Sequence, residues 1–188
     1  MRLLTSAGAA RSPAALAHCA HYGVAMRITK AAEYHATPEQ VFAVLSDKAF
    51  QNAKCAATAA IEHEATVEAN GERTVITTER VLPSHSLPDF ARSLVGPTLK
   101  VVETQDWGPA NADGSREGTV DMQVVGAPMS LKGTVRLEPG GPGTLEHIDA
   151  ELKAKVPLMG GKIEKAAAPS IQEAIDIEVQ TAHEWLHG

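Results

Sequence analysis

Apolar and polar residues alternate along the segment PMSLKGTVRLEP, residues 128–139. Met129, Leu131 and Leu137 fall on one face of an extended chain, and charged or hydroxyl-bearing residues fall on the other. The same alternation occurs in residues 119–124 and 148–156, and Gly- and Pro-rich turns separate the three segments. Consecutive strands with one apolar and one wet face predict an antiparallel sheet that is covered on one side only.

The segment from residue 160 to the end can cover that face. Its apolar residues recur at steps of three and four, which predicts an amphipathic helix of about seven turns. The apolar positions are Ile163, Ala167, Ile171, Ile175, Val179, Ala182 and Leu186. Because proline lacks an N–H and clashes with the preceding turn, Pro169 predicts either a kink or a helix that begins late.

The chain from Met26 to this helix predicts one α+β domain. Residues 26–35 fit a first strand, and a T-x-x-Q capping box at Thr37 with Pro38 after it starts a short helix. A second short helix is expected through 49–52. Asn70-Gly71 then predicts a hairpin that opens a run of antiparallel strands. We expect about seven strands in all, with residues 26–188 forming a single domain.

Residues 1–25 differ in composition from the rest. They contain no acidic residue and are rich in alanine, and their apolar stretch is too broken for a secretory signal. We interpret them as a disordered or over-called extension, with Met26 as the working start. A transit peptide is the alternative.

Composition limits the partners that the chain can have. The formal net charge is −6, which argues against nucleic acid and against anionic membrane surfaces as primary partners. No apolar run approaches the roughly 20 residues of a membrane-spanning helix, so we expect no integral membrane association. Cys19 and Cys55 are not in a paired motif, which favours unpaired thiols and a cytoplasmic location. Composition leaves the oligomeric state open.

The predicted order of elements resembles the helix-grip fold of the START-like, polyketide cyclase and pollen-allergen (SRPBCC) superfamily. The segments HATPEQVFAVLSD (35–47), GAPMSLKGTVRLEPGGPGT (126–144) and KVPLMGGKIEKA (155–166) resemble it, and the last two are similar to one uncharacterised actinobacterial family of unknown function within it. The resemblance implies a curved sheet wrapped around the C-terminal helix. It also implies a central cavity, in which superfamily members bind lipids, sterols, polyketides or plant hormones.

HEWLH, residues 183–187, matches the H-E-x-x-H pattern of zinc metalloproteases. A catalytic zinc needs a third protein ligand, which usually follows the motif, but only Gly188 remains. We therefore interpret the motif as part of the apolar stripe and expect no metal site.

The cavity-facing positions form the candidate binding site. His63 alternates with Ile61 and Ala65, which suggests either a polar ligand anchor or a core histidine with a local hydrogen bond. One of Glu79 and Arg80 faces inward, as a ligand anchor or as part of a structural ion pair. The predicted ligand-binding residues are His63, Val120, Met122, Met129, Leu131, Leu152, Ala154, Ile171 and Ile175.

Three functions fit this prediction. The first is binding, with or without transport, of a hydrophobic small molecule such as a lipid, isoprenoid or polyketide. The second is a cyclase or dehydratase that uses His63 with a nearby carboxylate. The third is an interaction module whose cavity is closed. We expect binding rather than catalysis, with no catalytic residue and no cofactor.

Overall fold

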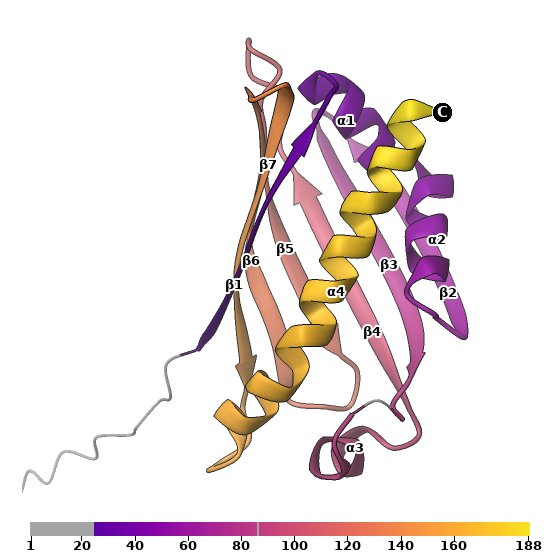
Figure 1. The fold of residues 1–188 in the computed structure, drawn as a ribbon, viewed down its shortest axis with the longest axis vertical. Helices are drawn as coiled ribbons and strands as arrows, with labels where there is room; N and C mark the ends of the chain where they lie inside the picture. Colours follow the sequence, from indigo (N-terminus) through magenta and orange to yellow (C-terminus); the bar gives the residue numbers. More distant parts are fainter. Residues whose placement is uncertain (1–24, 86) are drawn as a thin grey trace, which may run out of the picture.

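The computed structural model describes residues 25–85 and 87–188 as one curved antiparallel sheet with four helices (Figure 1). The sheet has seven strands in the order β1-β7-β6-β5-β4-β3-β2. The strands are β1 (Met26–Tyr34), β2 (Glu62–Asn70), β3 (Arg73–Pro83), β4 (Thr98–Trp107), β5 (Arg116–Val124), β6 (Met129–Gly140) and β7 (Gly143–Ala154). The helices are α1 (Pro38–Leu45), α2 (Lys48–Ala57), α3 (Asp89–Val95) and α4 (Gly160–His187). The predicted helix-grip fold is confirmed.

Short turns hold the strands in the register that the sequence pattern requires. In the first hairpin Asn70 pairs with Arg73, so Gly71 and Glu72 form a two-residue turn. Gly71 has a φ of 65°, which a residue without a Cβ adopts at little cost. The register of β6 with β7 places Leu131 opposite Leu152 and Val135 opposite Ile148. The alternating apolar residues of neighbouring strands therefore share the covered face.

Side-chain caps start the first two helices. The Thr37 side chain accepts from the Gln40 backbone N–H, and the Gln40 side chain accepts from the Thr37 backbone N–H, as the sequence predicted. Asp47 caps α2 by accepting from the backbone of Ala49 and Phe50. Both helices pack against α4, and α2 also packs against β2 and β3. Figure 1 shows α3 at the end of the molecule opposite α1.

Helix α4 lies diagonally across the covered face of the sheet (Figure 1). It is continuous over 28 residues with Pro169 inside it, so the alternative of a late start is wrong. Two features fix its first turn against the end of β7. A Cβ on Gly160 would lie 2.4 Å from the Ala154 carbonyl oxygen, so only glycine permits this approach. The buried Glu164 side chain accepts a hydrogen bond of 2.9 Å from the Ala154 N–H.

Aromatic side chains fill the core at the α1 end of the molecule. Phe42 packs edge-on against Trp107 at a centroid distance of 5.6 Å, and Phe50 packs edge-on against Trp185 at 5.7 Å. Tyr34 is fully buried beside them. Towards α3 the covered face carries smaller aliphatic side chains instead. A cavity lies between these side chains and α4, and it forms the candidate site.

Candidate functional site

A cavity of about 410 Å³ lies between the sheet and α4. Strands β3 to β7, helix α3 and one face of α4 line it. Its volume falls within the range of about 300–1,000 Å³ that is typical of small-molecule sites. Exposed residues such as His85, Leu94 and Pro128 also line it, so the cavity reaches the surface beside α3.

Most of the predicted site residues meet at this cavity. Those that line it are Val120, Met122, Met129, Leu131, Ala154, Ile171 and Ile175. They come from four elements and place their aliphatic and thioether groups on the wall. The two methionines add side chains that adapt to varied apolar shapes.

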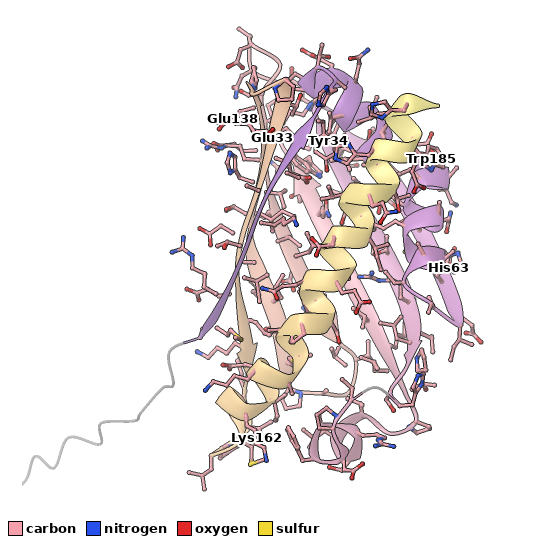
Figure 2. The ribbon with its side chains drawn as sticks, viewed as in Figure 1. Glu33, Tyr34, His63, Glu138, Lys162 and Trp185 are labelled. Atoms are coloured by element: carbon pink, nitrogen blue, oxygen red, sulfur yellow. The ribbon has the colours of Figure 1, made fainter. Side chains whose placement is uncertain are left out.

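Two predicted residues lie elsewhere. Leu152 is fully buried in the core and does not line the cavity. His63 is exposed at the outer margin of β2, as Figure 2 shows. Its register partner is Arg80, so it does lie on the covered face, but β2 is the last strand of the sheet. The alternation gave the correct face but did not reveal that the strand is an edge strand, so the predicted cavity position of His63 is corrected.

Charged side chains form one part of the cavity wall. Arg80, Glu103 and Glu178 all line the cavity, and Lys54 lies behind them. The Arg80 Nη2 donates to Glu103 Oε2 at 2.7 Å. The Lys54 ammonium lies 3.3 Å from both Glu103 Oε1 and Glu178 Oε2. We call these four residues the ion cluster; it joins α2, β3, β4 and α4.

The strand register decides between Glu79 and Arg80. Arg80 is 4% exposed and points inward, whereas Glu79 points outward and pairs with Lys100 at 2.5 Å. Of the two roles considered for the inward residue, the ion pair is present, and Arg80 also lines the cavity. Its Nε is buried and has no hydrogen-bond partner among the described residues. An unpaired buried donor can bind an acceptor on a ligand.

The ion cluster favours the charged states of Glu103 and Lys54. Burial alone would raise the pKa of Glu103, but the cations of Lys54 and Arg80 outweigh it, so this pKa lies below its ordinary value. Burial alone would lower the pKa of Lys54, but the carboxylates of Glu103 and Glu178 raise it. Two cations therefore face two carboxylates, which is the arrangement that makes buried charge tolerable.

A second buried carboxyl lies behind the ion cluster. The Tyr34 hydroxyl donates to Glu146 Oε2 at 2.6 Å. Burial and the nearby Glu178 raise the pKa of Glu146 to about 7, although Tyr34 and Lys54 oppose the shift. Glu146 does not line the cavity. It can therefore change its charge near neutral pH without touching a ligand.

The HEWLH segment contributes to packing. The His183 ring lies 4.9 Å from that of Tyr34, and Trp185 packs on Phe50. The Nδ1 of His187 lies 2.6 Å from the His183 carbonyl oxygen, within its own helix. Residues 25–85 and 87–188 contain no group of three or more His, Cys, Asp or Glu side chains placed to hold a metal ion. Across the same residues no helix is both long and apolar enough to cross a bilayer. The prediction for residues 1–25 lies outside the described residues, except for Ala25.

Comparison with solved structures places this arrangement of sheet and helices in a known fold. TTHA0849 from Thermus thermophilus has a TM-score of 0.57 at 16% identity, over 86% of this chain and 97% of that one. The Zhui aromatase/cyclase from Streptomyces sp. R1128 has a TM-score of 0.57 at 9% identity, over 86% and 93%. Human STARD10 has a TM-score of 0.53 at 12% identity, over 83% and 62%. These likenesses show the START-like fold.

Sequence comparison gives the family. The uncharacterised proteins Rv0481c of Mycobacterium tuberculosis and Mb0491c of Mycobacterium bovis are each 26% identical to the chain over 113 residues. The alignment covers 59% of this chain and 64% of each relative, which is less than two thirds of their length. Residues 29–186 match the family described as "Protein of unknown function (DUF2505)". The chain therefore belongs to the DUF2505 family, and its fold is START-like.

Proposed function

We propose that the protein binds an amphipathic small molecule in the cavity between the sheet and α4. The observation that carries the proposal is the division of the cavity wall into an aliphatic part and the ion cluster. Each 100 Å² of apolar ligand surface removed from water would contribute about 2.5 kcal/mol before the entropy of association is subtracted. A hydroxyl, carbonyl or carboxylate of the ligand would accept from Arg80 Nε. Lipids, isoprenoids and polyketides that carry one polar end meet both requirements.

The wall also favours binding over the two alternatives. A closed interaction module would leave no space of this size between sheet and helix. A cyclase or dehydratase that uses His63 would need that side chain at the cavity, and His63 is exposed on the edge strand. One protein of the same fold is named as an aromatase/cyclase, so an enzyme remains the second hypothesis. The binding proposal does not rely on that protein.

The buried free thiol of Cys55 fits a reducing compartment, and we propose the cytoplasm.

Native mass spectrometry of the protein purified from cell extract tests the proposal. We expect a discrete additional mass of lipid size, which is lost on denaturation. Ile175→Trp should remove that mass while the fold is retained, because the indole would occupy the cavity beside α4. Gln172→Trp is the matched control, since Gln172 is exposed on the same helix and does not line the cavity.

Two results would contradict the proposal. One is a bare polypeptide mass that also stays unchanged after incubation with fatty acids and isoprenoid alcohols. The other is full retention of the ligand by a folded Ile175→Trp variant, which would place the ligand outside this cavity.

A further inference from the structure

Three segments meet around the opening of the cavity. They are α3, the turn between β5 and β6, and the loop between β7 and α4 (Figure 1). The Lys155 N–H donates to the Pro128 carbonyl at 2.7 Å, which joins the second segment to the third. Lys162 lies in the first turn of α4, directly after the third segment (Figure 2). Its ammonium lies 4.2 Å from the centre of the Phe90 ring, which joins this turn to α3. Each segment also contributes to the cavity lining.

Each of the three segments exposes a large apolar side chain. Leu94 of α3 is 42% exposed, and Val125 of the β5–β6 turn is 57% exposed. Leu158, in the β7–α4 loop, is fully exposed. The other exposed large apolar residues in the described part of the chain are Ile61 and Trp185. Exposed apolar side chains that gather around a cavity opening indicate a surface that another apolar phase covers.

The backbone at Leu158 strengthens this inference. Its φ is 63°, in the left-handed region that β-carbon-bearing residues rarely adopt and that Asn and Asp tolerate best. The loop VPLM, residues 156–159, is wholly apolar. This strained conformation directs a leucine into solvent, where it makes no contribution to the core. The exposure and the backbone conformation of Leu158 together favour a role in a contact outside the chain.

Positive charge surrounds the apolar tips, although the chain as a whole is acidic. Lys155 and Lys165 are exposed beside the loop, and Lys162 lies between the loop and α3. The nearby acidic side chains already have partners: Asp89 forms an ion pair with Arg92, and Glu164 points inward and accepts from the Ala154 N–H. The net charge of −6 therefore does not describe this end of the molecule.

We propose that this end of the protein docks on the surface of a lipid bilayer that contains anionic headgroups. The docking surface consists of Leu94, Val125, Leu158, Lys155 and Lys165. Apolar tips would enter the boundary of the acyl chains, and the lysines would contact the headgroups. A two-fold dimer through the same surface would instead bring lysine against lysine. Docking in this orientation turns the cavity opening towards the bilayer.

Vesicle flotation tests the proposal, with phosphatidylcholine vesicles that either contain or lack phosphatidylglycerol. We expect the full chain to float with the phosphatidylglycerol vesicles. Leu158→Asn should lower the partition coefficient by roughly tenfold or more, because a leucine side chain leaves the apolar phase. Thermal unfolding should be unchanged in this variant, since the side chain is fully exposed and Asn suits the backbone.

The electrostatic part has its own variants. Lys155→Gln combined with Lys165→Gln should lower partition onto the phosphatidylglycerol vesicles by roughly 25-fold, at about fivefold per lysine. Lys48→Gln is the control, because Lys48 is exposed at the start of α2, near the other end of the molecule. Raising the salt concentration should weaken binding of the unchanged protein and have little effect on the double variant.

The proposal goes beyond small-molecule binding, and the two fail separately. Absence of flotation, or flotation that Leu158→Asn leaves unchanged, would overturn docking even if a ligand mass is present. Self-association in the absence of vesicles that Leu158→Asn abolishes would assign the surface to a second copy and would also overturn it. Loss of the ligand mass in Ile175→Trp with unchanged flotation would leave docking intact.

Discussion

Replacing Glu103 by glutamine tests whether the ion cluster holds the sheet and helices together. Glu103 accepts from Arg80 at 2.7 Å, from Gln105 at 3.0 Å and from Lys54 at 3.3 Å. The amide offers one acceptor oxygen and no charge, so Arg80 would lose its carboxylate partner and Lys54 would keep only Glu178. Removing one partner of a buried pair costs about 3–5 kcal/mol. We expect a loss of about 3 kcal/mol, because Lys54 keeps one partner.

Urea denaturation followed by circular dichroism measures this loss. With an m-value of about 2 kcal/mol/M, the midpoint should fall by about 1.5 M. Glu79→Gln is the matched control, since it removes the same charge from an exposed pair with Lys100 on the same two strands. The control should lose less than about 1 kcal/mol.

The pH dependence of the stability difference between the unchanged protein and Glu103→Gln adds a further check. Since the folded-state pKa of Glu103 lies below its unfolded value, the contribution of Glu103 is complete above the unfolded pKa of about 4.3. It is lost as the pH falls through the folded-state pKa. The difference in free energy of unfolding between the unchanged protein and Glu103→Gln should therefore become smaller at acid pH. Equal midpoints for Glu103→Gln and Glu79→Gln at neutral pH would refute the stabilising role.

Three further predictions concern other parts of the structure. Because burial raises the pKa of Glu146 from 4.5 to about 7, ionisation destabilises the fold as the pH rises through this range. At pH 8 the free energy of unfolding of Glu146→Gln should therefore exceed that of the unchanged protein by up to about 3 kcal/mol, and near pH 4 the two should be equal. Urea denaturation measures both values. An equal difference at both pH values would contradict this prediction. Gly160→Ala should lower the free energy of unfolding by about 1–3 kcal/mol, because the new Cβ would clash with a carbonyl oxygen. At Gly161 a Cβ would meet no atom within 4 Å, so Gly161→Ala should leave the stability in thermal melts unchanged or raise it. His63→Ala should leave the ligand mass in native mass spectrometry unchanged, and loss of the ligand would return His63 to the site.

The sequence predicted the sheet and helices because their signals are local. Alternation identified the strands, and the T-x-x-Q box at Thr37 located the start of α1. The same alternation placed Met122 on a face that does line the cavity, and the helical period did so for Ile171. Alternation failed for His63 because the order of strands in the sheet, and hence which strand is an edge, depends on contacts distant in sequence.

For the same reason, the sequence indicated the ion cluster only through the open alternative of Glu79 or Arg80 as an inward charge. Lys54 lies in a short helix of mixed composition, and Glu178 is one of several acidic residues of α4 and does not stand out from them. Both are buried only because α2 and α4 pack against each other over β3 and β4. A local pattern gives no sign that four charges from four elements meet.

The pairing of β1 with β7 has a consequence for how the chain reaches this fold. Arg27 and Asp149 form an ion pair across 122 residues of sequence, so β1 has no neighbour in the sheet until β7 has been synthesised. Contacts between such distant residues slow folding, because a long loop must close before the contacts form. The ion cluster imposes the same order, since Glu178 arrives last, on α4. Until then Lys54 and Arg80 have only Glu103 as a partner, and the excess positive charge would draw the acidic face of the last helix onto the sheet. The pairing of β1 with β7 and the docking of α4 are thus expected to complete the sheet and the charge balance late in folding.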